Sequence, residues 1–413
     1  MPDDDYLSAP AAAALLGVSL NTFYVYVGRH GIRSQPVAGS RERLYWRQDL
    51  LRLRTRRAAR QDRAAEAGAA RPPRGELRRE SALTLITEQG PFYRGQSALE
   101  LAEAGATLED VAGILWDADA ARVFATPAPD APPQLAAMSA LLQGLPWPDR
   151  AALALPLLEL ANPRAFDLTA PGMARTGGAV IRWLAAILTG DSAPAAGPVH
   201  RHVADRLGLG AANADLLRRL LVLSADHGFE PAAYAVRAVA ANGVTPWRAV
   251  MTGLLVSVGR RSSLSRHEAA GRLLTEALDG PDATAPLLRC LRDGEVIPGF
   301  EPGVYGPADP RAEALLSALA AVAADERDYR RFLALIEAVR EARSQGPSLL
   351  IVNQFLGRRL GLGPARWLFP LARAVGWIAH AIEQTAQGEA EHREGLYLGP
   401  LPKVSSRMRS MPA

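Results

Sequence analysis

From residue 81 onward, apolar residues recur every three or four positions, the interval that places them on one face of an α-helix. β-branched runs of the kind that form strands are nearly absent. Two segments rich in proline and alanine, 125–133 and 189–198, are predicted to be surface links. The pattern predicts a large all-α body with helices at Ser97–Ala104, Leu108–Trp116, Ala151–Leu160, Gly177–Leu188, Ala211–Ser224, Ala232–Ala241, Pro246–Val258, His267–Leu278, Arg311–Ala324, Asp328–Arg343 and Trp367–Gln387.

The first 57 residues follow a different pattern, in which two short helices are separated by a tight turn. Ser8 is a good N-cap and Gly17 readily adopts the left-handed conformation that ends a helix, so a first helix is predicted over Ala11–Leu16. Ser19 caps a second predicted helix, Leu20–Val27, which the following glycine closes. Two short helices joined in this way predict a helix-turn-helix.

The second predicted helix has two distinct faces. One face carries Leu20, Phe23 and Val27 and is predicted to pack in the core. The other face is predicted to enter the major groove of DNA, while segments 33–35 and 43–46 form a two-stranded wing whose arginines reach phosphates. The candidate DNA-binding residues are Asn21, Thr22, Tyr26, Arg29, Arg33, Arg41, Arg43 and Arg47.

The positive charge of the chain is concentrated in its N-terminal fifth. The 413 residues carry a net charge of +4, and 46 of the 47 basic residues are arginines. Residues 1–80 hold fifteen arginines against nine acidic residues, a balance of +6, so the remainder sums to −2. This block favours a polyanionic partner, although a solvated helix face followed by a charged linker gives the same pattern. Residues 58–80 are predicted to form a basic helical arm and a linker.

Composition and motifs exclude several classes of protein. With 48% hydrophobic and 22% charged residues, the chain is expected to be globular. The sequence contains no run of 18 apolar residues, so no membrane-spanning helix is predicted. The acidic start is unlike an export signal, so a cytoplasmic protein is expected. The single cysteine, Cys290, excludes an intramolecular disulfide. Neither a phosphate-binding glycine motif nor a metal-ligand spacing is present, and no cofactor or metal is predicted.

The N-terminal pattern also resembles a known family. The strings are Leu15-Leu16-Gly17-Val18-Ser19, Thr22-Phe23-Tyr24-Val25-Tyr26-Val27 and Arg43-Leu44-Tyr45. Over residues 6–57 they are similar to the winged helix-turn-helix of the MerR/excisionase type, which implies DNA binding through the second helix and the wing. Domains of this shape also serve as protein-interaction modules, and that alternative stays open.

A second set of strings lies in the helical body. In chain order they are Phe92-Tyr93-Arg94-Gly95, Ala225-Asp226-His227-Gly228, Ile297-Pro298-Gly299-Phe300, Asp309-Pro310-Arg311, Ala372-Arg373-Ala374-Val375-Gly376-Trp377 and Tyr397-Leu398-Gly399-Pro400. Together they resemble the citrate synthase family over about residues 81–400, which implies an all-α fold with a large and a small helical domain. We therefore predict a winged helix-turn-helix at 1–57, an arm and linker at 58–80, a large domain at 81–264 plus 361–413, and a small domain at 265–360.

The resemblance also implies a chemistry. The family condenses acetyl-CoA or propionyl-CoA with oxaloacetate, using an aspartate as base and two histidines that stabilise developing oxyanions. In this chain the three family positions fall on Ser262, Pro302 and Leu350. Proline has no N–H to donate, and leucine accepts no proton. The catalytic set is therefore predicted to be lost, and the protein is expected to be inactive alone.

Part of the family's anion-binding set is present. His227 matches the substrate histidine, and Arg311 and Arg373 match arginines that hold carboxylates. Arg393 lies one position from a further family arginine. These four residues are the candidate ligand-binding residues, with a residual CoA or a di- or tricarboxylate as the ligand that the resemblance implies.

Two nearby acids leave a second interpretation open. Unpaired buried guanidinium groups are costly, so either an anion or a neighbouring acid must satisfy Arg311 and Arg373. If Glu230 or Glu301 turns inward and pairs with them, the pocket is a structural relic. The same acids would repel a dicarboxylate, so a changed ligand is also consistent with the sequence.

Three functional hypotheses result. The first is a non-catalytic, ligand-sensing homodimer that binds double-stranded DNA through its N-terminal domain. The second is a non-catalytic subunit of a heteromer with a catalytic citrate synthase chain, docked through that domain. The third is an active citrate or 2-methylcitrate synthase with relocated catalytic residues. None of the three requires a membrane.

Overall fold

The computed structural model describes residues 6–30, 32–37, 42–47, 49–51, 53, 80–142, 144–260, 265–362 and 367–387. These residues form two compact units, one before Glu80 in the chain and one within Glu80–Ala390. Each unit has its own hydrophobic core. The two are described separately below.

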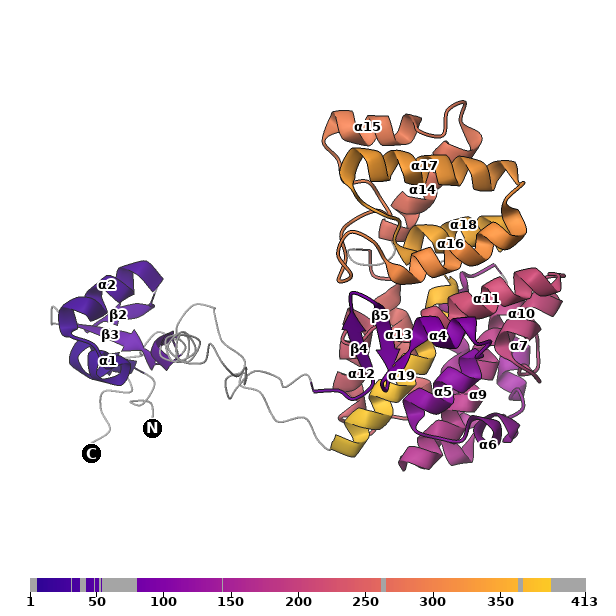
Figure 1. The fold of residues 1–413 in the computed structure, drawn as a ribbon. Helices are drawn as coiled ribbons and strands as arrows, with labels where there is room; N and C mark the ends of the chain where they lie inside the picture. Colours follow the sequence, from indigo (N-terminus) through magenta and orange to yellow (C-terminus); the bar gives the residue numbers. More distant parts are fainter. Residues whose placement is uncertain are drawn as a thin grey trace. The chain divides into compact units, whose positions relative to one another are not determined.

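The N-terminal unit combines a small sheet with two helices (Figure 1). β1 (Tyr6–Ser8) and β2 (Ser34–Pro36) pair antiparallel with the central β3 (Arg43–Trp46), so the two strands predicted for a wing are confirmed. α1 (Ala9–Leu16) begins after Ser8, whose Oγ accepts a hydrogen bond from the Ala11 amide at 3.4 Å. It ends at Gly17 with a φ of +62°, as the sequence predicts.

The second helix differs from its prediction in three respects. α2 (Leu20–His30) continues through Gly28, which a helix interior tolerates at a cost of about 1 kcal/mol. Leu20 was expected in the core but is 41% exposed, because it lies at the first position of the helix. Tyr26 was expected on the DNA-binding face but packs against the core, since it lies three residues after the buried Phe23 and shares its face.

The helical body begins with a sheet that the sequence pattern does not predict. β4 (Thr84–Thr87), β5 (Gly90–Tyr93) and β6 (Gln96–Ser97) form an antiparallel sheet in that order. Strands of two to four residues are too short to give a readable alternation of polar and apolar positions. The tight connections depend on glycines with positive φ, Gly90 and Gly95.

All eleven helices predicted for the body are confirmed in the described part of the chain, although several begin or end a few residues from the predicted position. They are α4 (Ala98–Glu103), α5 (Leu108–Trp116), α8 (Trp147–Leu160), α9 (Ala170–Thr189), α11 (Ala211–Leu223), α12 (Pro231–Ala240), α13 (Pro246–Ser257), α14 (Ser265–Asp279), α16 (Pro310–Ala323), α17 (Arg327–Arg343) and α19 (Leu368–Gln387).

Further helices lie where the sequence pattern predicts none. Most are short, so they contain too few turns for a repeat to be read, and α18 is buried on nearly every side. They are α6 (Ala120–Ala125), α7 (Pro133–Leu142), the 3-10 helix Pro163–Phe166, α10 (Val199–Arg206), α15 (Ala285–Asp293) and α18 (Leu349–Arg359).

α19 lies at the centre of the body, where it packs against α5, α9, α11, α12 and α13 (Figure 1). The Trp377 ring of this helix lies against Gly253 of α13, where a Cβ atom would collide with it. A second close approach is made at Gly376, whose amide donates to the Ala225 carbonyl at 3.1 Å. Small residues at these two points therefore allow α13 and the segment before α12 to approach α19 closely.

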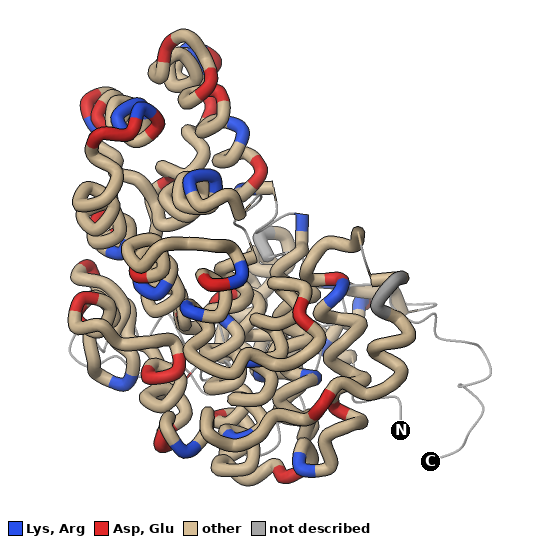
Figure 2. The backbone as a smooth tube through the Cα atoms, turned by 90° about the vertical axis from the view of Figure 1, so that its right-hand side faces the viewer, with Lys and Arg blue, Asp and Glu red and all other residues tan. Residues whose placement is uncertain are grey.

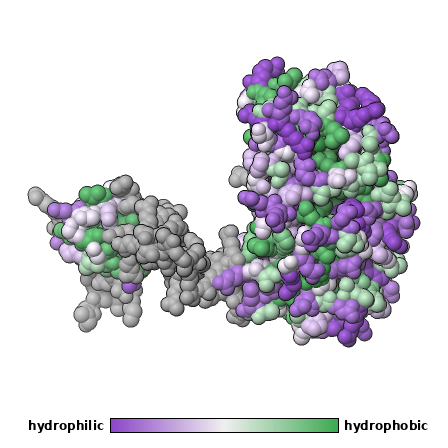
Figure 3. All heavy atoms as spheres, viewed as in Figure 1, coloured by the Kyte–Doolittle hydropathy of each residue, from purple (hydrophilic) through white to green (hydrophobic). Residues whose placement is uncertain are grey.

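Helices α14–α18 gather at one end of the body, coloured orange in Figure 1. They pack on one another, with α16 also contacting α11 and α4. The boundary between a large and a small domain at residues 264–265 and 360–361 stays a prediction. Figure 2 shows acidic and basic residues interspersed along this body, and Figure 3 shows hydrophilic and hydrophobic residues interspersed on the viewed face.

No single helix among the described residues is long and apolar enough to cross a membrane. The pair Ala9–Leu16 and Leu20–Gly28, bent by 92°, reaches that length and composition only when the two helices are taken together.

Candidate functional site

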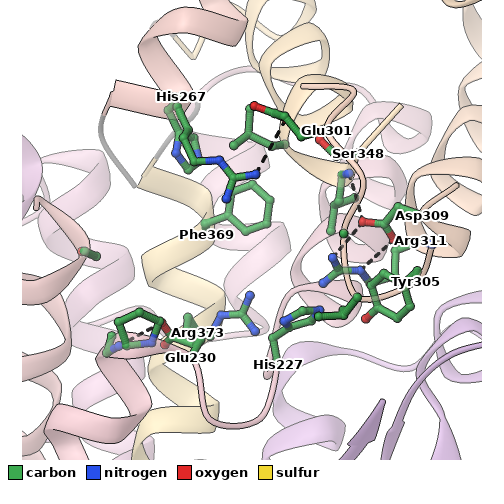
Figure 4. A pocket seen from close by; sticks show the side chains of 18 of the residues that line it. His227, Glu230, His267, Glu301, Tyr305, Asp309, Arg311, Ser348, Phe369 and Arg373 are labelled. Carbon is green, nitrogen blue, oxygen red and sulfur yellow. Dashed lines mark hydrogen bonds and ion pairs between the residues drawn. The ribbon is translucent and has the colours of Figure 1, made fainter. Parts of the chain in front are cut away.

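A cavity of about 450 Å³ lies in the helical body, between the start of α12 and α19 on one side and the loops before α16 and α18 on the other (Figure 4). Three of the four predicted ligand-binding residues, His227, Arg311 and Arg373, line this cavity. The fourth, Arg393, lies outside the described residues. Side chains from segments about 150 residues apart in sequence therefore meet at one site.

His227 stands in the loop between α11 and α12. Gly228 follows it with a φ of +63°, and the Gly228 amide donates to Asp226 Oδ2 at 2.9 Å, which fixes the turn. Burial, together with the positive charges of Arg311 and Arg373, lowers the pKa of His227 to about 2. The imidazole is therefore neutral, and its Nε2 has no hydrogen-bond partner within the described part of the chain.

Asp226 supports this loop from behind. It is fully buried, and its Oδ1 lies 3.3 Å from Nε2 of His380, which is itself fully buried on α19. Burial alone would raise the pKa of Asp226, but His380 and Arg373 hold it well below its ordinary value. The carboxylate is therefore charged, and it faces His380 and Arg373 of α19.

Arg311 lies in the first turn of α16 and is 7% exposed. Asp309, the N-cap of the same helix, accepts from Arg311 Nε at 3.0 Å and from Nη2 at 2.8 Å. The guanidinium also lies 4.9 Å from the centroid of the Tyr305 ring. Its remaining nitrogen, Nη1, is buried and has no hydrogen-bond partner among the described residues.

Arg373 comes from the middle of α19, between Phe369 and Trp377. These three residues are four positions apart, so they line the cavity along one face of the helix. Nη1 of Arg373 is buried, and no hydrogen-bond partner for it occurs in the part of the chain that the structure describes. The arginine thus offers a donor to the cavity, as Arg311 does.

Tyr305 completes this group, and sequence reasoning did not single it out. It is 6% exposed, its ring packs edge-on against His227 at 5.5 Å, and burial raises its pKa to about 12. Its hydroxyl also has no hydrogen-bond partner in the described chain. No pattern in the sequence marks it, because only the folded loop before Asp309 brings its ring against His227 and Arg311.

The two glutamates that the sequence offered as partners for the arginines are engaged elsewhere. Glu230 caps α12, accepting from the Ala232 amide at 2.9 Å, and also accepts from Trp377 Nε1 at 2.9 Å. Glu301 accepts from the Gly299 amide at 2.9 Å and lies 3.7 Å from Nη2 of Arg266. Among the described residues no ion pair joins either glutamate to Arg311 or Arg373, so the open interpretation in which a glutamate pairs with these arginines is not supported, and Asp309 pairs with Arg311 instead.

The three positions that match the family's catalytic residues are placed as follows. Leu350 lies at the second position of α18 and lines the cavity. Pro302 is exposed in the loop between α15 and α16, beside Glu301. Ser262 lies outside the described residues.

The candidate DNA-binding residues of the N-terminal unit show several local contacts. Asn21 is exposed on α2, whereas the Thr22 hydroxyl lies 2.8 Å from that of Ser19. Exposed beside Asn21 are Tyr24 and Val25, which the sequence analysis did not assign to this face. The outward face of α2 is therefore more apolar than predicted.

The arginines of the predicted wing also differ from their predicted role as phosphate contacts. Arg33 forms a bidentate pair with Asp49, with Nε–Oδ2 and Nη2–Oδ1 distances of 3.0 Å, so it joins the start of β2 to the segment after β3. Arg43 is exposed and its Nε donates to Ser34 Oγ at 2.9 Å. Arg47 is exposed. Arg41 and the side chain of Arg29 lie outside the described residues.

The fold is mostly helical, its cavity brings His227, Arg311 and Arg373 together, and comparison with known proteins identifies the family. A model of the citrate synthase C-terminal domain matches residues 179–393, just over half of the chain. The chain belongs to the citrate synthase family.

Several relatives match in sequence. The putative citrate synthase 2 of Mycobacterium bovis is 28% identical over 196 residues, which are 44% of this chain and 50% of that protein. The citrate synthase of Haloferax volcanii is 28% identical over 43% of this chain and 48% of its own length. The 2-methylcitrate synthase of Shewanella oneidensis is 26% identical over 44% and 50%. The chain thus spans about half the length of the curated relatives it matches.

Solved structures match over more of the chain. The citrate synthase of Thermotoga maritima aligns with a TM-score of 0.64 at 21% identity, covering 81% of this chain and 97% of that one. The citrate synthase of Thermoplasma acidophilum, solved with carboxymethyl coenzyme A and oxaloacetate, aligns with a TM-score of 0.64 at 17% identity, covering 84% and 99%. At these identities the likeness shows the fold.

Proposed function

We propose that this protein is a non-catalytic member of the citrate synthase family that binds a carboxylate ligand and regulates through an N-terminal DNA-binding unit. One observation carries the proposal. Four buried polar atoms without partners in the described chain, on His227, Tyr305, Arg311 and Arg373, belong to side chains grouped around one cavity. At the position of the family's base, the same cavity is lined by Leu350.

The polar group supports an anion because buried donors that find no acceptor cost about 1–3 kcal/mol each. A carboxylate has two oxygens and accepts several hydrogen bonds, so one carboxylate can satisfy most of this group. Charge-assisted bonds from guanidinium groups are about twice as strong as neutral ones. The grouping therefore favours a carboxylate over a neutral ligand.

The loss of catalysis follows from the chemistry that the family resemblance requires. A general base contributes roughly 10²–10⁴-fold to a rate, and an oxyanion donor about 10²–10³-fold. Leu350 accepts no proton and Pro302 donates none. Although such factors are not additive, losing several leaves little turnover.

An active enzyme with relocated residues is less well supported. Asp309, Glu230 and Glu301 all line the cavity and are the available substitutes for the base. Each already accepts hydrogen bonds, from Arg311, from the start of α12 and from the Gly299 amide respectively. A carboxylate engaged in this way is a weak base for a C–H proton.

The N-terminal unit supports the DNA-binding part of the proposal. Two helices joined at Gly17 and two paired strands are the elements of a winged helix-turn-helix, and exposed Arg43 and Arg47 lie at the strand that ends the wing. Residues 1–80 carry a balance of +6, which favours duplex DNA as partner. A homodimer would present two such units to paired half-sites.

A second candidate function rests on the outward face of α2. Leu20, Tyr24 and Val25 are 41%, 49% and 62% exposed, and apolar exposure of this kind favours a protein partner. In this alternative the unit docks the chain onto a catalytic citrate synthase in a heteromer. In such a heteromer, the cavity of this chain would be a binding site for CoA or for a di- or tricarboxylate.

Two measurements on the purified full chain test the proposal. Release of thiol from acetyl-CoA and oxaloacetate should stay at background, whereas turnover near 1 s⁻¹ would restore the enzyme hypothesis. A carboxylate should raise the melting temperature of the wild type but not of Arg373→Ala. The matched control is Arg292→Ala, whose side chain is 76% exposed on α15, and it should respond like the wild type.

Co-purification separates the two partner hypotheses. Recovery of duplex DNA that is lost at high salt supports the regulator, because phosphate contacts release counterions. Recovery of a second citrate synthase chain, lost in the Tyr24→Ala variant, supports the heteromer instead.

A further inference from the structure

The wall of the cavity changes from charged to apolar along α19, and this change indicates a class of ligand. Arg373 faces the cavity at one level, and Phe369 lies one helical turn earlier, as Figure 4 shows. We propose that the cavity binds a monocarboxylate with an apolar tail, rather than the dicarboxylate that the family resemblance implies. This inference rests on the proposed function, in that a carboxylate must bind there at all.

The polar end is suited to a single carboxylate. Asp309 already occupies Nε and Nη2 of Arg311, so that arginine offers only Nη1 to a ligand. The positive charge of Arg373 helps to lower the pKa of the buried Asp226, so this arginine also acts on an acid outside the cavity wall. With Asp309 paired to Arg311, the group offers hydrogen bonds for one carboxylate rather than excess charge for two.

The apolar end occupies the region where the family's base would act. The Leu349 amide donates to Asp309 Oδ2 at 3.2 Å, which fixes the start of α18 beside the Asp309–Arg311 pair. Leu350, the next residue, lines the cavity. Trp367 and Pro370 line it together with Phe369. Arg266 and His267 also line this end, and the His267 ring packs edge-on against Phe369 with centroids 5.6 Å apart. A second carboxylate placed here would lose its hydration and would have to compete with Glu301 for Arg266.

Acids on the remaining wall oppose a second carboxylate as well. Glu230 and Glu301 both line the cavity, and neither is neutralised by Arg311 or Arg373 in the described chain. Arg266 is the one further cation among the lining residues that the structure describes, and it lies 3.7 Å from Glu301. A distal carboxylate would therefore have to displace Glu301 or approach it. A volume of about 450 Å³ lies within the range of small-molecule sites.

The test uses two acids of equal length, hexanoate and adipate, with butanoate as a shorter monocarboxylate. Calorimetric titration of the full chain should give a Kd for hexanoate at least tenfold below that for adipate. Because each buried methylene contributes about 0.8 kcal/mol, or roughly fourfold in affinity, the two extra methylenes of hexanoate should make it bind about fifteenfold more tightly than butanoate. These ratios are measured on the wild type and require no variant.

Two substitutions then locate the ends of the ligand. Arg373→Ala should weaken hexanoate and butanoate alike, because it removes a carboxylate contact. Leu350→Asp should weaken hexanoate at least tenfold, since it places a charge beside the tail. The matched control is Leu160→Asp, at the 72%-exposed end of α8, which should leave both affinities unchanged.

The outcomes separate the inference from the function on which it rests. If adipate binds as tightly as hexanoate, and Arg373→Ala abolishes both, the site takes a carboxylate but the apolar-tail proposal is wrong. If hexanoate binds equally to the wild type and Arg373→Ala, its binding is unspecific and the proposal is also wrong. If none of these acids binds, and oxaloacetate and citrate also leave the melting curve unmoved, the proposed carboxylate function itself fails.

Discussion

The cavity of the helical body and the N-terminal unit both contain arginines that the sequence marks as ligand contacts, but the two regions use them differently. In the cavity, Arg311 and Arg373 each keep one buried nitrogen for which the described chain provides no partner. In the N-terminal unit, Arg33 is held by Asp49 through two hydrogen bonds, and Arg43 donates to Ser34 across the strands.

The difference shows that an unpartnered arginine nitrogen is informative about ligand binding only where it is buried. Away from water, a donor without a protein partner costs free energy, so a donor that borders a cavity favours an acceptor there, either a ligand or a water molecule. At the surface, water satisfies every donor, and an exposed arginine such as Arg47 indicates nothing by geometry alone. The cavity therefore supports a ligand from structure, whereas the DNA-binding hypothesis depends on charge and motif.

The largest expected effect distinguishes the two cavity arginines. Arg311→Ala leaves Asp309, which is 9% exposed, as a buried acid without its cation, and should lower the free energy of unfolding by about 3–5 kcal/mol. Arg373→Ala should cost about 1–2 kcal/mol, because its Nη1 has no bond to lose and His380 still lies 3.3 Å from Asp226, whose charge Arg373 also helps to maintain. Urea unfolding of the full chain measures both. Equal losses would mean that Arg373 is a structural cation, and the cavity arginines would then not differ from the paired arginines of the N-terminal unit.

Much of the body could be predicted from sequence, because long amphipathic helices leave a periodic signal. The convergence of His227, Arg311 and Arg373 on one cavity was also anticipated, through the resemblance of their local strings. Tyr305 could not be assigned, since only the folded loop brings its ring within 4.9 Å of a guanidinium. The role of Glu230 as the N-cap of α12 could not be predicted either, because its charge alone does not show which groups it contacts in the folded protein.

The next prediction tests how dry the polar end of the cavity is. His227 has a pKa of about 2 in the folded protein and about 6.5 when unfolded, so below pH 6.5 the unfolded chain binds a proton that the native state does not. Stability should fall as the pH falls, by about 2 kcal/mol from this residue between pH 6.5 and 5. His227→Gln should remove that part of the slope, as urea unfolding at several pH values would measure.

A second buried histidine provides the internal reference for this measurement. Burial lowers the pKa of His200 to about 4, and it contributes the same sign of pH dependence in both proteins. The difference between wild type and His227→Gln therefore isolates His227. An unchanged slope would mean that water reaches the imidazole, so the cavity groups would be hydrated in the same way as the surface arginines.

A smaller effect is expected for Arg33 in the N-terminal unit. The pair with Asp49 is partly buried, with side chains 23% and 13% exposed, so Arg33→Ala should destabilise this unit by about 1–2 kcal/mol. Arg33→Lys should not restore it, because a lysine cannot form both hydrogen bonds. Faster amide hydrogen exchange in β2 and β3 would report the loss. Unchanged exchange together with weakened DNA retention would instead make Arg33 a phosphate contact.

The smallest expected effect concerns Arg47, and it addresses the region where the structure is least informative. If the N-terminal unit binds duplex DNA, the affinity of the full chain should fall steeply with salt, and Arg47→Ala should reduce the slope of log K against log salt by about one. The loss should be uniform across DNA sequences, because a phosphate contact positions the protein without reading bases. Arg292→Ala, on the helical body, is the control and should keep the full slope. An absence of DNA retention even at low salt would leave the apolar face of α2, with Tyr24 and Val25, as the functional surface of the unit, and a protein partner would take the place of DNA.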